Sequence, residues 1–198
     1  SQDVTVTSLN GTWASAYNMF ANVDLIEEIS AGSEVAIPYH VALAQIMEAY
    51  TYISLVDYVG DVPYSQANQF GDFPTPVLDA GEDVYAAQIA LLDTAIANLN
   101  QESAVIPQDL FYGSFDADNW IAVANTLKLK AHLNMGDGAA ISALLSENII
   151  DTDDASKNVY GRFDYFHSVA PSFWGVDWIV EMVVKIWDEE HEHIGPVG

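Results

Sequence analysis

The chain has 198 residues and a mass of 21.6 kDa, and 51% of its residues are hydrophobic, which is enough material for one sizeable core. Its 29 acidic residues against five basic ones give a net charge of -24, so nucleic acid and anionic membrane surfaces would be repelled. The absence of cysteine excludes disulfides, thiol catalysis and cysteine-ligated zinc. The opening stretch, SQDVTVTSLNGTW, has neither the basic region nor the apolar core of a signal peptide.

The first half of the sequence predicts two helices. In residues 12–29 the large apolar side chains are three or four apart, the spacing of an amphipathic helix. A second helix is expected from Pro38, because proline is favoured in a first helical turn, and to continue through residues 41–59. Its polar residues recur at every third position and form a narrow stripe on an otherwise apolar cylinder: Gln45, Glu48, Thr51, Ser54 and Asp57. A helix of this kind is covered on most sides by others.

Glycine and proline interrupt residues 60–81, which therefore read as a long ordered loop. Loops of this length in a compact domain are usually functional or carry a partner contact. A helix with a clean apolar stripe then begins at Glu82. The next helix is capped by Asp116 or Asp118 and stops at Gly136, and a short helix follows at residues 139–145.

The fold class predicted from these elements is all-α, built from helix pairs of similar length in a tetratricopeptide-like arrangement with long ordered loops. Trp13, Tyr85 and Trp120 fall on helical stripes and are expected in the core. After residue 147 the pattern changes to an irregular, aromatic-rich segment at 160–178, with a possible C-terminal helix after it. We therefore divide the chain into a helical scaffold at residues 1–147 and a second region at 148–198.

Three stretches carry a family resemblance: AYTYISLVDYVGDVPYSQA, VYAAQIALLDTAIANL and NWIAVANTLKLKAHLNM. In this order and spacing they resemble the SusD/RagB family, outer-membrane lipoproteins of Bacteroidetes that capture glycans. The matching positions are Gly60, Asp61, Val62, Pro63 and Tyr64, then Tyr85, Leu92, Ala95, Ile96 and Leu99, then Trp120, Ala124, Asn125, Leu127, Lys128 and Leu129.

The resemblance implies a surface-exposed protein of the outer membrane that binds a glycan without cleaving it. It implies a partner, a SusC-like TonB-dependent transporter, and membrane attachment only through a lipid on an N-terminal cysteine that is absent from this sequence. Because members of the family are usually much longer, the resemblance also implies a fragment that lacks its anchor and most of its later half.

The turn at the end of the second helix has a structural interpretation and a functional one. Gly60 supplies unusual dihedral angles, Asp61 binds nearby backbone amides, and Pro63 prevents the helix from continuing. Together with Tyr64, the turn is also expected to aim the loop that follows toward the transporter or the ligand.

Sugar recognition needs flat aromatic faces with amides or carboxylates beside them. The densest aromatic cluster lies in the second region, and its candidate ligand-binding residues are Tyr165, Phe173, Trp174, Trp178 and Asp177, with Phe166 and Asp164 close by. The alternative for this cluster is ordinary packing in a core or between domains.

Two short stretches contain residue types that can bind metals. Asp151, Asp153 and Asp154 have a calcium-like spacing but lack the glycine and the closing glutamate of an EF-hand loop. His191 and His193 alternate with acids rather than lying one helical turn apart as in HExxH, so a solvated acidic tail is the simpler interpretation. We therefore predict no resident cofactor, with calcium as the one open possibility.

No catalytic residues are predicted, because no nucleophile elbow, phosphate loop or dinucleotide fingerprint is present. The leading hypothesis is a non-enzymatic glycan-binding protein that delivers its ligand to a transporter. Two alternatives remain open: a helical-repeat scaffold that binds proteins or peptides, for which a groove lined by the polar stripe would argue, and an α-helical glycosidase.

Overall fold

The computed structural model of the chain describes residues 10–150. Within that range the chain forms five helices: α1 (Asn10–Gly32), α2 (Pro38–Val59), α3 (Gly81–Leu99), α4 (Ala117–Met135) and α5 (Gly138–Leu144). The described residues contain no β-strand, only one isolated antiparallel bridge between Val62 and Asp79. The predicted all-α fold is therefore confirmed.

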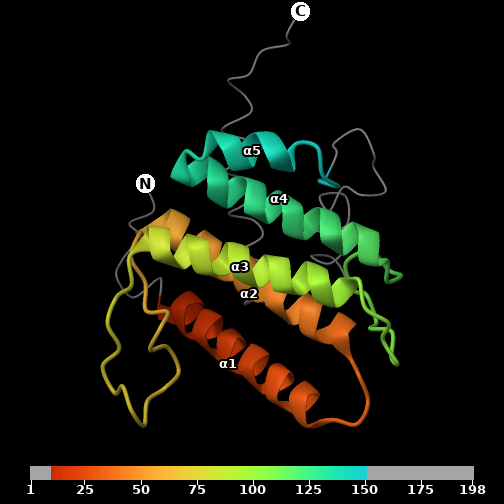
Figure 1. Cartoon of the computed structure of the whole chain (residues 1–198). Coiled ribbons are helices and arrows are strands. Elements are labelled where there is room, and N and C mark those ends of the chain that lie inside the picture. Colours follow the sequence, from red (N-terminus) through yellow and green to blue (C-terminus); the bar gives the residue numbers. More distant parts are fainter. Residues whose placement is uncertain (1–9, 151–198) are drawn as a thin grey trace, which may run out of the picture.

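The helices stack in chain order, α1 on α2, α2 on α3, α3 on α4 and α4 on α5, and α2 also reaches α4 (Figure 1). Side-chain contacts give the directions. Glu27 late in α1 meets Gln45 early in α2, and Gln45 meets Asn98 late in α3. The Asn134 side chain, late in α4, donates to the Tyr85 hydroxyl, early in α3, at 3.2 Å, so each of the helices α1 to α4 runs antiparallel to the next. This is the tetratricopeptide-like pairing that the sequence predicts.

The helix ends follow their capping residues. Pro38 occupies the first turn of α2, and Asp116, one of the two candidates, caps α4 by accepting a hydrogen bond from the Asp118 amide at 3.0 Å. Gly136 adopts the left-handed conformation after α4, with φ 72°, as a C′ glycine does. The first helix is longer than predicted at both ends.

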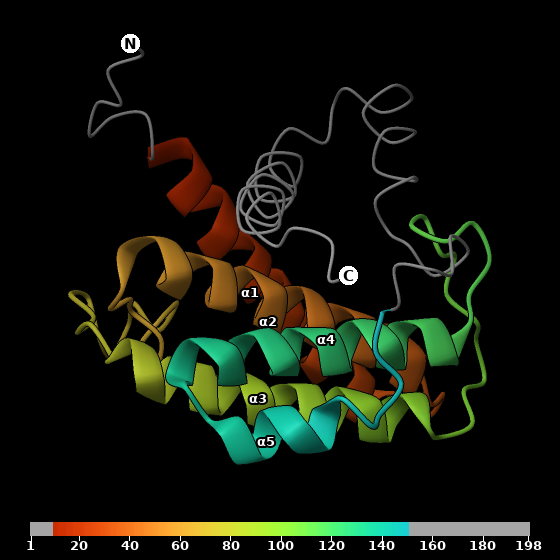
Figure 2. The ribbon, with the colours of Figure 1, turned by 90° about the horizontal axis from the view of Figure 1, so that it is seen from above.

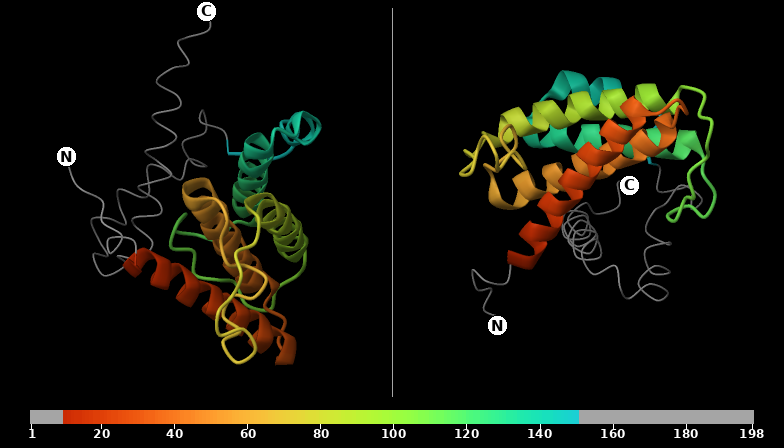
Figure 3. Two further views of the ribbon diagram at one scale, coloured as in Figure 1. Left: turned by 90° about the vertical axis from the view of Figure 1, so that its left-hand side faces the viewer. Right: turned by 90° about the horizontal axis from the view of Figure 1, so that it is seen from below.

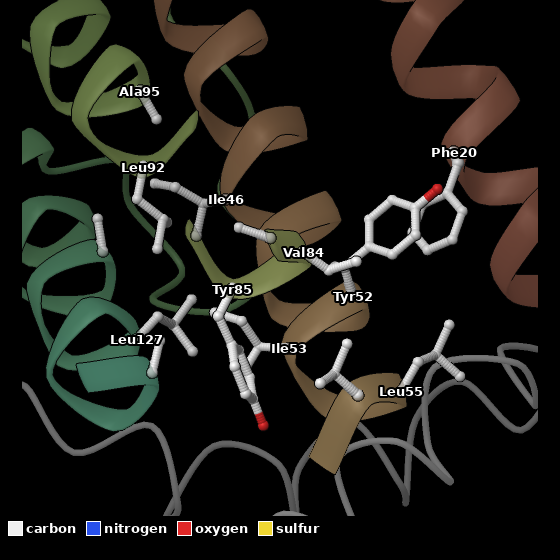
Figure 4. Packing of buried hydrophobic residues seen from close by; sticks show 14 of the residues in the cluster. Phe20, Ile46, Tyr52, Ile53, Leu55, Val84, Tyr85, Leu92, Ala95 and Leu127 are labelled. Carbon is white, nitrogen blue, oxygen red and sulfur yellow. The ribbon is translucent and has the colours of Figure 1, made fainter. Parts of the chain in front are cut away.

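The core lies where α2 faces α1 on one side and α3 and α4 on the other (Figure 4). On the α1 side the Phe20 and Tyr52 rings stack at 3.8 Å between centroids, and on the α3 side Ile46, Ile53 and Leu92 are almost completely buried. The predictions for Tyr85 and Trp120 are confirmed, and Trp13 packs against the same cluster while only partly buried. As expected from its composition, α2 is covered on most sides.

Two long connections leave the helical stack at opposite ends (Figures 1 and 2). Residues 60–80, between α2 and α3, project from one end, and residues 100–116, between α3 and α4, project from the other. Figure 3 shows the first of these loops beside α1, which crosses α2 at an angle. The antiparallel pairing of the helices explains these positions. The C-terminal end of α2 and the N-terminal end of α3 lie at one end of the stack, and the C-terminal end of α3 and the N-terminal end of α4 lie at the other.

Candidate functional site

The turn after α2 begins at Gly60. Its backbone adopts φ 80° and ψ -117°, a combination open to glycine because it carries no Cβ. The Gly60 amide donates to the Val56 carbonyl at 2.9 Å, which closes the last helical turn. Pro63 follows and cannot continue a helix. The predicted helix stop is therefore confirmed.

The two ends of the 60–80 loop are joined to each other. Asp61 Oδ1 accepts a hydrogen bond from the Gly81 amide at 3.0 Å, so its partner lies twenty positions further along the chain. The backbones of Val62 and Asp79 exchange two hydrogen bonds, of 3.3 and 2.9 Å. The sequence anticipated an amide partner for Asp61 but gave no indication that it would close a loop.

Asp79 is the main hydrogen-bond acceptor of this closure. Its Oδ2 accepts from the amides of Tyr64 and Ser65 at 2.8 and 2.9 Å, and its Oδ1 accepts from the Ser65 hydroxyl at 2.7 Å. Partial burial works against the charged form, but these three hydrogen bonds outweigh it and hold the pKa of the Asp79 carboxyl below its usual value. Sequence reasoning missed Asp79.

The loop is also attached to α1. The Tyr17 hydroxyl donates to the Pro63 carbonyl at 2.7 Å, and the Asn68 side-chain amide donates to the Tyr17 carbonyl at 3.0 Å. The Tyr64 ring meets the Tyr52 ring edge to face at 5.0 Å. Burial first, and then the negative charge of Asp79, raise the pKa of Tyr17, which keeps its hydroxyl a donor. The turn is thus held by α1 and α2 as well as by the far end of its own loop.

The outer part of this loop exposes large apolar side chains. Phe70 is 69% exposed, Leu78 64% and Val77 53%, and Phe73 is also exposed. Inside the loop, Gln66 Oε1 accepts from the Val77 amide at 3.1 Å. Apolar groups held in water by an ordered backbone are typical of contact surfaces. We call Phe70, Phe73, Val77 and Leu78 the loop patch.

The predicted polar stripe of α2 does not line an open groove. Gln45, Thr51 and Ser54 are each less than 5% exposed. The Gln45 side chain donates to Glu27 at 2.7 Å and accepts from Asn98 at 3.1 Å, which links three helices. The hydroxyls of the other two turn back to carbonyls of α2 itself. A groove lined by this stripe would have favoured a protein-binding scaffold, and these three positions do not line such a groove.

The remaining two members of the stripe are carboxylates. Burial raises the pKa of Glu48 to about 7, and the negative charges of Asp24 and Glu27 add to the effect. Asp57, near the C-terminal end of α2, pairs with Lys130 at 2.7 Å, accepts from the Asn134 side chain at 2.6 Å and also binds the Tyr85 hydroxyl. The Asp57 contacts join α2 to α3 and α4, whereas Glu48 lies close to two like charges of α1.

Asp109, in the connection before α4, forms a buried polar pair with Trp120 in the first turn of that helix. Asp109 is 4% exposed, and its Oδ2 accepts from the indole Nε1 of Trp120 at 2.7 Å. Its Oδ1 accepts from the amides of Phe111 and Tyr112 at 2.8 and 2.7 Å. A buried charge is tolerated when it is hydrogen-bonded in this way, and the pair fixes the 100–116 connection onto α4.

The predicted ligand-binding residues Tyr165, Phe173, Trp174, Asp177 and Trp178 lie outside the described residues. So do the calcium candidates at 151–154 and the histidines at 191 and 193. Within residues 10–150 no three acidic or histidine side chains are grouped so as to hold a metal ion. In the same range no helix combines the length and apolar character needed to cross a membrane.

A stack of antiparallel helices that presents a loop closed at its base defines a tetratricopeptide-like class of helical-pair proteins. Comparison with known proteins specifies the family. A sequence profile of the SusD-like family, described as starch-binding and associating with the outer membrane, matches residues 2–159. The chain therefore belongs to the SusD-like family.

Solved structures of SusD-type proteins resemble this chain. A SusD/RagB family protein from Bacteroides thetaiotaomicron is 26% identical with a TM-score of 0.60, and the match covers 83% of this chain and 37% of that one. A chitin-binding protein is 26% identical with a TM-score of 0.61, covering 80% and 36%. A SusD homologue from Bacteroides fragilis, 24% identical with a TM-score of 0.61 and covering 72% and 32%, shares the fold. No curated protein matches the chain.

The chain thus spans about a third of the length of these solved relatives. The larger part of each solved relative therefore has no counterpart in this chain.

Proposed function

We propose that this protein binds a glycan at the cell surface and delivers it to a SusC-like TonB-dependent transporter of the outer membrane. The observation that carries the proposal is the family match over residues 2–159, whose description is starch-binding and associating with the outer membrane. The structural relative described as chitin-binding supports a polysaccharide as the ligand class. Binding rather than catalysis is the proposed activity.

The ligand-binding residues remain those that the sequence predicts: Tyr165, Phe173, Trp174, Asp177 and Trp178. Aromatic rings would stack on the CH-rich faces of sugar rings, and the carboxylate would accept hydrogen bonds from hydroxyl groups. A neutral glycan suits a chain with a net charge of -24, because an anionic ligand would be repelled.

The transporter contact is proposed at the loop patch. Its apolar side chains are exposed on a backbone that Asp61, Asp79 and Tyr17 hold in place. A partner protein gains affinity when the loop it binds is already ordered, because less conformational entropy is lost on association.

Affinity electrophoresis through gels containing starch, chitin or other polysaccharides tests glycan binding directly. We expect retardation in at least one gel, and loss of that retardation in Trp174→Ala and Trp178→Ala. Phe70→Ala is the matched control, since it removes an exposed aromatic ring outside the proposed glycan site. Migration unchanged in every gel would overturn the proposal. Release of reducing sugar would instead identify a glycosidase.

Copurification from outer membranes tests the second half of the proposal. The chain is expected to retain a TonB-dependent transporter, and the double change Phe70→Ser and Leu78→Ser is expected to reduce its recovery at least about tenfold. Capture of a soluble protein in its place, with no glycan affinity, would favour the scaffold alternative.

A further inference from the structure

The first helix is attached to the stack on one side only. Among the described helices α1 packs against α2 alone, whereas α2 also meets α3 and α4. Of the side chains described in α1, Ala16, Phe20 and Val23 are buried, while α2 buries twelve. A helix with one neighbour and few buried apolar groups can separate locally while the rest of the protein stays folded. The polar groups between α1 and α2 therefore affect how firmly α1 is held.

Two contacts fix the register of α1 on α2. The Phe20 and Tyr52 rings stack at 3.8 Å between centroids, and the Gln45 side chain donates to Glu27 at 2.7 Å. Along α1 the second contact lies seven residues after the first, and along α2 it lies seven residues before it. Residues midway between the two contacts on α1 therefore lie opposite the residues midway between them on α2.

Asp24 and Glu48 occupy these midway positions. Each lies four residues from the stacked rings and three from the hydrogen bond that involves Glu27, on the helix face that makes both contacts. Asp24 is at the exposed edge of the interface, and Glu48 lies further inside. Two carboxyl groups are therefore opposite each other between α1 and α2, with the Glu27 carboxylate one turn further along α1.

No lysine or arginine balances these carboxyl groups in the described part of the chain. Residues 10–116 contain neither residue type, and their single histidine, His40, lies about 12 Å from Glu48 along the α2 axis. The two lysines of α4, Lys128 and Lys130, are engaged in ion pairs with carboxylates of α3 and α2.

The other titratable groups that face Glu48 are tyrosines. Tyr52 of α2 and Tyr64 of the 60–80 loop are near enough to feel its charge, and α3 contributes the neutral Gln88 beside Tyr64. Burial raises the pKa of both tyrosines, so they stay neutral at moderate pH. Burial first, and then the two carboxylates of α1, raise the pKa of Glu48 to about 7. Glu48 is therefore the group of this interface whose charge changes near neutral pH.

The first helix also holds the start of the 60–80 loop. The Tyr17 hydroxyl donates to the Pro63 carbonyl at 2.7 Å, and the Tyr17 carbonyl accepts from the Asn68 side chain at 3.0 Å. Movement of α1 away from α2 would break both contacts. The hydrogen bonds of Asp79 to the same loop involve no residue of α1 and would remain.

We propose that α1 is a pH-dependent clasp on the 60–80 loop: as Glu48 ionises opposite Asp24, α1 separates from α2 and releases the loop, while α2, α3 and α4 stay packed. Two facing negative charges without a lysine or arginine oppose the contact. As regulation of the loop patch, the clasp rests on the transporter contact proposed above. A loosened loop loses more conformational entropy on binding, so affinity for the transporter falls at alkaline pH.

Hydrogen exchange of the whole 198-residue chain, read by mass spectrometry at pH 5 and pH 8, tests the clasp without any partner. After correction for intrinsic exchange, we expect protection of residues 10–32 to fall at least about tenfold, and residues 63–73 to follow. This exchange should be insensitive to low urea concentrations, because local opening exposes little surface. Residues 117–135 should exchange more slowly at both pH values and accelerate in urea. Equal rates and equal urea dependence in α1 and α4 would overturn the proposal.

Three single variants assign the effect to the facing carboxyl groups. Glu48→Gln should remove the pH dependence of exchange in α1, and Asp24→Asn should reduce it, because the charge opposite Glu48 is gone. Glu28→Gln, exposed on the same helix, is the matched control and should leave the dependence unchanged. A dependence that survives in Glu48→Gln would refute the clasp.

Recovery of the transporter at the two pH values separates this regulation from the proposed function. We expect recovery to fall from pH 5 to pH 8 with the parent chain and to stay constant with Glu48→Gln. Constant recovery with the parent, while exchange in α1 changes, would overturn the regulation of the loop patch. Absence of the transporter at both pH values would instead count against the transporter contact, and exchange in α1 would still decide the clasp.

Discussion

Asp61 and Gly81 lie twenty positions apart in the sequence and are joined by one hydrogen bond of 3.0 Å, from the Gly81 amide to the Asp61 carboxylate. Gly81 begins α3, and a Cβ at this position would lie 2.8 Å from Val56 Cγ1 of α2. The start of α3 therefore packs directly against the end of α2. The loop between them begins and ends at one place, and its outer residues are displayed from a fixed base.

Asp79→Ala should loosen the point where the two ends of the 60–80 loop are joined. The change removes the acceptor of three hydrogen bonds, from Tyr64 and twice from Ser65, so the free energy of unfolding is expected to fall by about 1–3 kcal/mol. Amide hydrogen exchange in residues 62–79 is expected to accelerate at the same time. Asp72→Ala, at an exposed position in the same loop, serves as control and should change stability by less than about 0.5 kcal/mol. Equal effects of the two changes would contradict the role of Asp79.

Gly60→Ala should be destabilising by about 1–3 kcal/mol, because φ 80° with ψ -117° is a conformation that a side chain makes strained. The space around Gly60 is open, so the cost is one of backbone conformation alone. Gly71→Ala is the matched control: the space there is also open, and its φ is not positive. Urea denaturation of both variants measures the difference, and a Gly60→Ala protein as stable as the control would contradict the strained turn.

Stability should depend on pH through Glu48. Burial first, and then Asp24 and Glu27, raise its pKa from 4.5 to about 7, so the native state holds this proton more tightly than the unfolded state. The favourable contribution is complete below pH 4.5 and is lost as the pH rises through 7. We expect the free energy of unfolding to fall by about 2–3 kcal/mol over that window.

Glu48→Gln should remove this part of the pH dependence and make the protein more stable than the parent at pH 8. Glu28→Gln, at an exposed position on α1, should leave the dependence unchanged. Denaturation curves at pH 5 and pH 8 give the comparison. An identical slope in the parent and in Glu48→Gln would show that another group titrates there.

Trp120→Phe should cost about 2–4 kcal/mol of stability, since Asp109 would keep its buried charge and lose the indole donor. Trp13→Phe, whose ring contact with Tyr17 a phenyl group can keep, should cost less than about 1 kcal/mol. Thermal unfolding monitored by circular dichroism distinguishes them. Comparable losses would mean that ring size, rather than the hydrogen bond to Asp109, determines the effect.

The helices could be predicted because their signals are local. Apolar residues three or four apart, Pro38 at a helix start and Gly136 at a helix end each act within one or two turns of the chain. Gly60 and Pro63 likewise predicted the turn from residues close together in the sequence. Asp116 and Asp118 were both reasonable caps, and the geometry of one hydrogen bond selected Asp116.

The roles of Asp79 and Asp109 could not be predicted, and neither could the distant position of the amide that Asp61 binds, since each depends on a partner that folding brings near. With 29 acidic residues in the sequence, nothing marked Asp79 and Asp109 as different from solvated carboxylates. The polar stripe of α2 shows the same limit. Its spacing indicated one face of a helix, while burial of Gln45, Thr51 and Ser54 was decided by the helices that cover that face.

The sequence by itself determined the class of fold, the order of the helices and the family. The reason is that helical periodicity, capping residues and the Gly-Asp-Val-Pro-Tyr turn each depend on residues close together in the chain. Only the tertiary structure decided which acids close the loop, which polar groups are buried and which carboxyl groups lie opposite each other between α1 and α2. Those outcomes depend on hydrogen bonds and packing between residues that lie from eleven to more than fifty positions apart, and contacts at such irregular separations leave no periodic pattern in a single sequence.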